Sequence, residues 1–287
     1  MIYLLISVFI SSFLFVIFKL FEVYKINTLQ AIVVNYVAAA TTGFIAYSGD
    51  ISFREIPKTS WFWGALFLGF LFIAVFNLMA LTSQQNGLSV ASVSGKMSVV
   101  IPVIFGVWAY QESVSLVKVI AILLALYSVY LTAQKERMHT KKSNRLLFPF
   151  LLFLGSGIID AAIKYFETKH LPPGGIPIFS ATIFAIAAII GIVILMIQLT
   201  KGKLRFKLKN IIGGICLGIP NYYSIYFLLK ALNTEGLESS TLFTINNVGV
   251  VMLSTIFGLL IFKERLNTKN WYGIALAIIA IITITLA

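Results

Sequence analysis

Residues 88–110, LSVASVSGKMSVVIPVIFGVWAY, are long and apolar enough to cross a membrane, yet they hold Lys96 well inside the stretch. A transmembrane helix needs about 20 mostly apolar residues. If a helix begins at Leu88, Lys96 lies roughly 12 Å from that end at 1.5 Å per residue. A lysine at that depth costs at least about 2.5 kcal/mol to insert, so it normally faces a cavity, a partner or a pathway. Pro102 would free one backbone carbonyl, which a membrane tolerates only where protein or water satisfies it.

The composition is typical of a membrane protein with many spans. Hydrophobic residues make up 59% of the chain and charged residues 11%, whereas charged residues are about 25% of ordinary soluble domains. The net charge of +12 comes from basic residues between apolar runs, where they act as topology signals. Because no nucleic-acid-binding motif is present, we expect no nucleic-acid partner. The expected partners are a small-molecule substrate and membrane lipids.

Metal and cofactor chemistry is not expected. Cys216 is the single cysteine, and His139 and His170 fall in connecting segments. Neither a disulfide framework nor a metal-ligand cluster can be assembled from this set. A membrane-embedded enzyme would need a nucleophile with a base, or a metal set, and the sequence offers neither. We therefore predict a protein that is not an enzyme and uses no cofactor.

The apolar runs, judged by their length and by what interrupts them, predict an all-α polytopic membrane protein with ten transmembrane helices. The predicted spans are residues 2–21, 29–47, 61–81, 88–110, 116–133, 146–166, 176–199, 211–232, 239–262 and 271–287. A polar and basic segment separates five spans from five. It predicts a first repeat at residues 1–134, a cytoplasmic linker at residues 135–145 and a second repeat at residues 146–287.

The two halves also resemble each other in sequence, at an offset that grows slowly along the chain. Lys19, Phe21 and Glu22 match residues 145 positions later, Gly64, Gly69 and Gly87 match residues 149 positions later, and Phe105, Gly106 and Glu112 match residues 152 positions later. Two diverged copies with small insertions would give this pattern. We predict that the chain arose by duplication.

An odd number of spans in each half means that the second copy enters the membrane inverted. The connection at residues 49–60 carries two basic and two acidic residues, whereas its counterpart at residues 201–210 carries five basic residues and no acidic one. Equivalent loops of opposite charge bias are what inverted repeats predict. With the basic loop and the linker in the cytoplasm, both termini are predicted on the non-cytoplasmic side.

With these features the chain resembles the drug/metabolite transporter superfamily, in particular its EamA-like ten-helix members. In each half a fourth helix runs into a short turn with a glutamate, Glu112 in IPVIFGVWAYQE and Glu264 in STIFGLLIFKER. Two positions depart from symmetry, because Ser254 stands opposite Pro102 and Ala121 opposite Gly273. The resemblance implies a secondary transporter of the inner membrane that moves small metabolites, often outward, by alternating access around a central cavity between the repeats.

Lys96 is the predicted substrate-binding residue, as a desolvated ammonium with three donors for an anionic group. The alternative is a structural lysine that pairs with Asp160. On the sixth span, Asp160 and Lys164 share a face and can pair with each other, or Asp160 can load a proton and couple transport to it. Phe15 stands at the matching position of the first span, so one half lacks such a carboxylate.

Tyrosines and asparagines complete the predicted site. Tyr222, Tyr223 and Tyr226 follow Pro220 in the eighth span and are predicted to line a pocket wall, with membrane-interface anchoring as the alternative. Hydrogen bonding between helices is the alternative to ligand contact for Asn77, Asn246 and Asn247. Glu112 and Glu264 are interpreted as helix-terminus and loop contacts. Small residues for close helix packing are predicted at Gly64, Gly69, Gly213, Gly214 and Gly218.

The sequence thus predicts an exporter of a small polar or anionic organic metabolite such as an amino acid. The main alternative is a carrier of a neutral solute or lipid precursor in which Lys96 is structural. A channel is the third possibility, although a channel needs rings of like polar residues along a pore. Spans five and ten are predicted at the periphery and fit either a monomer or a homodimer.

Overall fold

The computed structural model describes residues 2–47, 49, 54–110, 115–133, 146–172, 175–202, 206–232 and 239–286. Every regular element in these ranges is a helix. They are α1 (Ile2–Val23), α2 (Thr28–Ala46), the short 3-10 helix η1 (Ile56–Lys58), α3 (Phe62–Gln85), α4 (Leu88–Met97), α5 (Val100–Tyr110), α6 (Leu116–Ala133), α7 (Leu147–Lys169), α8 (Ile176–Thr200), α9 (Leu208–Leu232), α10 (Ser239–Phe262) and α11 (Thr268–Leu286). The linker at residues 135–145 and Glu112 lie outside the described residues.

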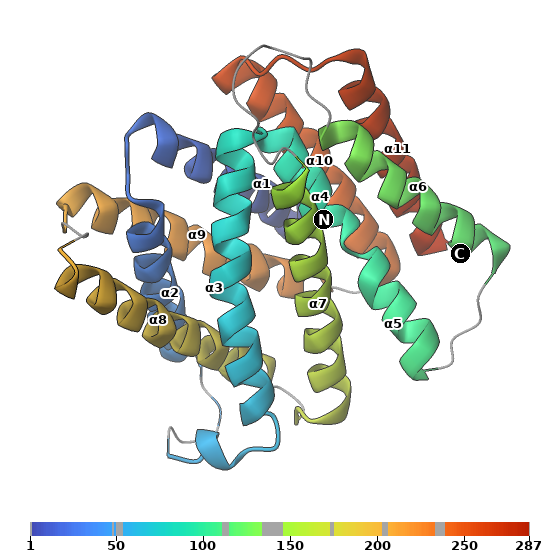
Figure 1. Cartoon of the computed structure of the whole chain (residues 1–287). Coiled ribbons are helices and arrows are strands. Elements are labelled where there is room, and N and C mark those ends of the chain that lie inside the picture. Colours follow the sequence, from blue (N-terminus) through green and yellow to red (C-terminus); the bar gives the residue numbers. More distant parts are fainter. Residues whose placement is uncertain are drawn as a thin grey trace. The chain divides into compact units, whose positions relative to one another are not determined.

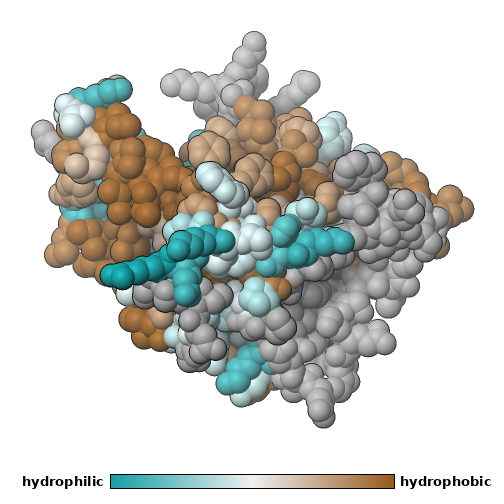
Figure 2. Space-filling model, turned by 90° about the horizontal axis from the view of Figure 1, so that it is seen from below, coloured by the Kyte–Doolittle hydropathy of each residue, from teal (hydrophilic) through white to brown (hydrophobic). Residues whose placement is uncertain are grey.

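Long apolar helices make this a membrane-embedded chain. Seven of them are long and apolar enough to cross a membrane within the described ranges, if α4 and α5 are counted together. The remaining predicted spans correspond to shorter apolar helices at Val119–Thr132, Leu147–Ile163 and Thr268–Thr283. Large side chains such as Ile45, Trp63 and Leu260 are exposed, and brown apolar residues cover much of the surface in Figure 2. A soluble protein rarely exposes so much contiguous apolar area.

The chain forms two compact units. The first unit comprises Met1–Leu20, Leu78–Ile158 and Tyr223–Ala287, and the second comprises Phe21–Asn77 and Ile159–Tyr222. Both units therefore take residues from both predicted repeats, and the boundary falls inside α1, α3, α7 and α9. The predicted repeats at residues 1–134 and 146–287 are defined by duplication and by membrane orientation, not by contacts, so the two units do not test them. The repeats stay a prediction.

In the first unit, α6 packs along α11 and α4 packs along α10 (Figure 1). The α6–α11 contact is built from small residues, since Ala121 and Ala125 of α6 and Ala277 and Ala280 of α11 are fully buried in one core. Small side chains let two backbones approach closely where lipid offers no hydrophobic driving force between helices. At the end of this pair the Asn270 amide donates to the Thr132 carbonyl at 2.8 Å, which satisfies the end of α6.

In the second unit, α2 packs along α8. Gly43 faces Ala181 of α8, with 3.0 Å between an ideal Cβ on the glycine and the alanine Cβ. The rings of Tyr36 and Phe184 stack with centroids 6.0 Å apart, and the Tyr36 hydroxyl donates to the Phe72 carbonyl at 2.7 Å. The contact between α2 and α8 therefore combines a close approach of small residues at Gly43 with aromatic packing around Tyr36.

The small-residue prediction is confirmed at all five glycines, which each face a neighbouring helix or the segment beside it. Their contacts are Phe166 for Gly64, Ile186 for Gly69, Ile26 for Gly213, Val34 for Gly214 and Asn35 for Gly218. The backbones approach equally closely at Gly214 and Gly218, where an ideal Cβ would lie 2.6 Å from the carbonyl oxygens of Ala31 and Asn35. No side chain fits between α9 and α2 at these two points.

Gly218→Val should therefore destabilise the protein. Overpacking a tight contact costs about 1–3 kcal/mol, which corresponds to a Tm lower by roughly 2–10 °C. Thermal unfolding in detergent measures it. Gly95→Ala is the matched control, because an ideal Cβ on Gly95 meets nothing within 4 Å. Equal Tm values for Gly218→Val and wild type would contradict the close approach.

The prediction of one continuous helix at residues 88–110 is wrong. The stretch forms α4 and α5, separated at Ser98 and Val99. Pro102 explains the break, because its ring clashes with the carbonyl four residues earlier, at Ser98, and it has no N–H to donate. The Ile101 N–H donates instead to the Ser98 carbonyl at 2.9 Å, a tighter turn. At the matching position of α10 stands Ser254, and α10 runs unbroken.

Candidate functional site

Lys96 lies in the last turn of α4, two residues before the break. Its side chain is half-buried. The neighbouring Gly95 borders open space, since an ideal Cβ there has no atom within 4 Å. Beside it, the Ser98 hydroxyl donates to the Gly95 carbonyl at 2.6 Å. The end of α4 therefore combines a lysine with a stretch of backbone at Gly95 that no described side chain covers.

Serines give α4 a polar surface that is nevertheless buried. Ser89 and Ser92 lie on the same face as Lys96, at positions i, i+3 and i+7. The Ser92 hydroxyl donates to the Ser89 carbonyl at 3.1 Å. The hydroxyls of Ser89 and Ser94, like that of Ser83 in α3, have no hydrogen-bond partner within the described ranges. Buried polar groups normally have one, so these three hydroxyls are exceptions within the described ranges.

Charge at the two ends of α4 matches the helix dipole. The carboxylate of Glu264 accepts the Leu88 N–H at 2.9 Å at the start of α4, and Lys96 lies in its last turn. Negative charge at a helix N-terminus and positive charge at its C-terminus are both favourable. The prediction that Glu264 makes a helix-terminus contact is confirmed.

Gly87 is what lets the carboxylate approach. Its φ of +107° is in the region that favours glycine. An ideal Cβ there would lie 2.9 Å from the nearer Glu264 carboxylate oxygen. Any side chain at position 87 would push the carboxylate away from the Leu88 N–H.

Helix α10 lies antiparallel beside α4. Leu88 is next to Gly258, with 3.6 Å between its Cβ and an ideal Cβ on the glycine. Counting equally along both helices makes Lys96 about level with Val250, in agreement with the shared core of Val93, Met97 and Val251. The predicted residues Asn246 and Asn247 are therefore about one turn further, level with the break.

Asn246 takes part in a buried junction of three helices. The Ser7 hydroxyl of α1 donates to the Ser224 carbonyl of α9 at 2.9 Å and lies 3.4 Å from the Asn246 Oδ1. All three residues are buried. This geometry favours interhelical hydrogen bonding, the alternative to ligand contact. Asn247 is half-buried and stays a candidate.

Tyr223 and Tyr226 belong to an aromatic cluster at the start of α1 and the end of α9. The Lys230 ammonium lies 4.7 Å from the Tyr3 ring centroid and 5.7 Å from that of Tyr226. Tyr223 is 38% and Tyr226 40% exposed. Exposed rings around a lysine near helix ends are typical of a membrane interface, so the cluster favours anchoring over a pocket wall.

The predicted site residues are divided between the two units. Lys96, Tyr223, Tyr226, Asn246 and Asn247 belong to the first unit, and Asn77, Tyr222, Asp160 and Lys164 belong to the second. In the second unit, the Asn77 amide donates to the Ile73 carbonyl of its own helix at 2.7 Å, and the half-buried Tyr222 ring contacts Gly43. Asp160 is exposed, and the Lys164 side chain is outside the described part of the chain.

Two features were not predicted from the sequence. The first is the set of buried serines. The sequence did contain a signal for it, because four of the ten residues 89–98 are serines in an otherwise mostly apolar run. The second is the role of Lys19. Its ammonium donates to the Gln84 carbonyl at the end of α3, at 2.7 Å, because the last carbonyls of a helix attract a cation. No group of three or more potential metal ligands occurs among the described residues.

Comparisons with known proteins support the fold. An uncharacterised protein of Haemophilus influenzae is 28% identical over 260 residues, which covers 88% of this chain and 86% of that protein. One protein of known crystal structure aligns over 98% of both chains with a TM-score of 0.55 and 11% identity. The fold has a solved relative. At that identity the likeness extends to the fold alone. No protein-family model matches the chain, so the resemblance to drug/metabolite transporters stays a prediction.

Proposed function

We propose that this protein is a secondary transporter, working outward, of a small polar or anionic organic metabolite such as an amino acid. The observation that carries the proposal is Lys96, half-buried at the end of a broken helix beside open space. Broken helices at mid-depth are where membrane transporters place substrate sites, because irregular backbone is tolerated there only against protein or a water-filled cavity. The cytoplasmic membrane is the proposed location.

The inverted-repeat architecture is part of the proposal and is supported by helix pairing. The helices that pack most extensively are the predicted equivalents, α2 with α8 and α6 with α11, and α4 also packs along α10. Equivalent helices also begin at the sequence offsets, since α7 starts 145 residues after α1 and α11 starts 152 residues after α6. A pseudo-two-fold axis would bring equivalent elements together in this way. Ten spans with both termini outside follow from the same architecture.

The proposed chemistry uses a charge and several hydroxyls. The Lys96 ammonium binds a carboxylate or another anionic group through charge-assisted hydrogen bonds. Hydroxyls on the same face of α4, such as that of Ser89, bind neighbouring polar atoms of the substrate. An exchange of access between the two sides of the membrane then carries the bound substrate across. Proton coupling by Asp160 has less support, since that side chain is exposed.

A ligand screen on purified protein tests the proposal. Amino acids, organic acids, phosphorylated metabolites and neutral sugars are added at millimolar concentration, and Tm is measured in detergent. A ligand at 100 times its Kd stabilises by about 2.7 kcal/mol, so even weak ligands register. We expect stabilisation by an anionic or zwitterionic compound, and saturable flux of that compound in proteoliposomes. Flux that rises linearly with concentration would instead indicate a channel.

Ser89→Ala separates binding from folding. Deleting a buried hydroxyl that has no protein partner in the described ranges removes a desolvation cost, so Tm without ligand should stay the same or rise. Kd for the ligand should rise about tenfold, equivalent to ~1.4 kcal/mol. The control is Ser92→Ala, whose hydroxyl is already bonded to the Ser89 carbonyl. An unchanged Kd in Ser89→Ala would remove this hydroxyl from the site.

The neutral-solute carrier is the second candidate function. It is favoured by the charges at the ends of α4. A positive charge in the last turn of a helix interacts favourably with the helix dipole, as Glu264 does at the first turn, so the position of Lys96 can be explained without a substrate. In that case neutral compounds stabilise the protein and anions do not.

A further inference from the structure

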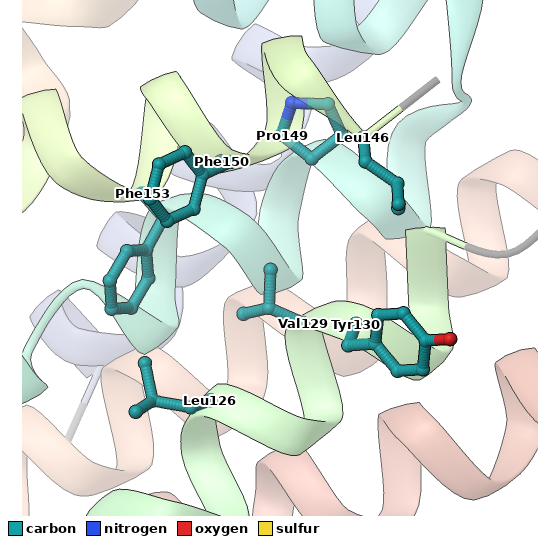
Figure 3. Close-up of a pocket in the computed structure, with 7 residues that line it drawn as sticks. All are labelled: Leu126, Val129, Tyr130, Leu146, Pro149, Phe150 and Phe153. Carbon is teal, nitrogen blue, oxygen red and sulfur yellow. The ribbon is translucent and has the colours of Figure 1, made fainter. Parts of the chain in front are cut away.

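A groove lies between α6 and the first turns of α7, within the first unit (Figure 3). Its volume is about 380 Å³, and it is lined by Leu126, Val129, Tyr130, Leu146, Pro149, Phe150 and Phe153. Among these side chains the Tyr130 hydroxyl is the single polar group. Val129 and Phe153 form a buried floor, whereas Leu126, Tyr130, Leu146 and Phe150 are partly exposed along the rim. The groove is therefore open on one side and almost wholly apolar.

The two ends of the groove differ in their position along α6 and α7. Figure 3 places Tyr130 and Leu146 at one end and Leu126 and Phe153 at the other. The end with Tyr130 and Leu146 is the one where α6 finishes and α7 begins. From Leu146 to Phe153 the α7 wall extends about 10 Å at 1.5 Å per residue. One leaflet of a bilayer has about 15 Å of hydrocarbon, so the groove covers most of one leaflet.

The basic residues in the connection between α6 and α7 indicate which molecule binds in the groove. The chain joins α6 to α7 through residues 134–145, whose sequence QKERMHTKKSNR holds five basic residues and one acidic residue. Arg145 directly precedes Leu146 of the groove. A basic segment beside a membrane collects on the cytoplasmic side and attracts anionic lipids there.

We propose that this groove binds one acyl chain of an anionic phospholipid. The acyl chain lies along the apolar floor, and the headgroup stays at the end marked by the Tyr130 hydroxyl, where α6 ends and α7 begins. The site is separate from the transport site around Lys96, and its existence does not depend on the proposed function.

Lipid binding to the full-length purified protein tests this site. The probes are phosphatidylglycerol and phosphatidylcholine with identical acyl chains, and native mass spectrometry measures retention after delipidation. Wild type should retain phosphatidylglycerol at least about tenfold better than phosphatidylcholine, and high salt should reduce the difference because it screens the headgroup. Glycerophosphoglycerol, which has the headgroup and no acyl chain, should not be retained.

The variant Leu126→Trp fills the groove from its half-exposed rim and should lower retention of phosphatidylglycerol about tenfold. The control Leu123→Trp lies one turn earlier on α6, is also exposed and does not line the groove. Phe150→Ala removes part of the opposite wall and should weaken retention as well, which keeps the test valid if the tryptophan disturbs folding. Equal retention of the two lipids by wild type would overturn the proposed preference for an anionic headgroup. Equal retention by wild type and both groove variants, or capture of a second copy of the chain at this face in place of lipid, would overturn the site.

Discussion

Replacing Lys96 with methionine should abolish the stabilisation that an anionic ligand gives this protein, while the ligand-free protein still folds. A charge-assisted contact contributes about 1.5–3 kcal/mol, so Kd should rise about 10- to 150-fold. Methionine is unbranched and about as long as lysine, and it removes the cost of placing a charge in the membrane. The half-buried position at the end of α4 accepts it without overpacking.

Lys19→Met is the matched control for this experiment. Lys19 is also a half-buried lysine of the first unit, and its ammonium donates to the Gln84 carbonyl of α3, outside α4, at 2.7 Å. Its loss should lower Tm and leave the ligand response intact, the opposite of the Lys96 result. If ligands stabilise wild type and Lys96→Met equally, or if Lys96→Met does not fold, Lys96 is structural and the substrate is to be sought among neutral solutes.

Replacing Glu264 with alanine should have the largest effect on stability. The carboxylate accepts the Leu88 N–H at 2.9 Å, at the positive end of the helix that carries the candidate site. Removal leaves an N-terminal donor of α4 without this acceptor, at a cost of about 1.5–3 kcal/mol for a hydrogen bond to a charged group. Tm should fall by roughly 3–12 °C.

Glu264→Gln distinguishes the charge from the hydrogen bond. Glutamine keeps an acceptor oxygen for the Leu88 N–H and loses the interaction with the helix dipole, which contributes about 0.3–1 kcal/mol. Its Tm should lie between those of wild type and Glu264→Ala. The exposed Glu55 provides the control, since Glu55→Ala should change Tm little. A Glu264→Ala protein as stable as wild type would contradict the capping role.

The positions of the helices follow from the sequence because they depend on local properties. An apolar run long enough to span a bilayer has to satisfy its own backbone, and a helix does so within the segment. The predicted spans accordingly coincide with helices to within four residues at their ends. The exception is the span at residues 88–110, which is divided into α4 and α5 near Pro102. Ser254 stands at the matching position of the unbroken α10, but α9 also runs unbroken through Pro220, so the local sequence alone does not decide which proline interrupts its helix.

The contacts between helices could not be predicted in the same way. A serine in an apolar helix carries no sign of whether its hydroxyl is bonded. That the Ser89 hydroxyl has no hydrogen-bond partner among the described residues follows only from the side chains around it. Lys19 has the same chemistry as Lys96 but ends at a helix carbonyl. The Lys230 ammonium lies over the ring of Tyr226, one turn earlier on α9, and also over the ring of Tyr3 in α1, a contact that the sequence does not indicate.

The sequence by itself determined that the protein is helical and membrane-embedded, where its helices lie, and that helices pack through small residues. Each of these depends on residue type and spacing along one segment. Only the tertiary structure decided that α4 ends beside open space, that Asn246 serves a buried junction with Ser7 and Ser224, and that α6 and α7 leave an apolar groove between them. These depend on which faces meet, and in a chain that is 59% hydrophobic many faces are apolar enough to meet. Which of these faces come into contact depends on how well their side chains fit together, and this fit cannot be derived from the residues of one segment alone.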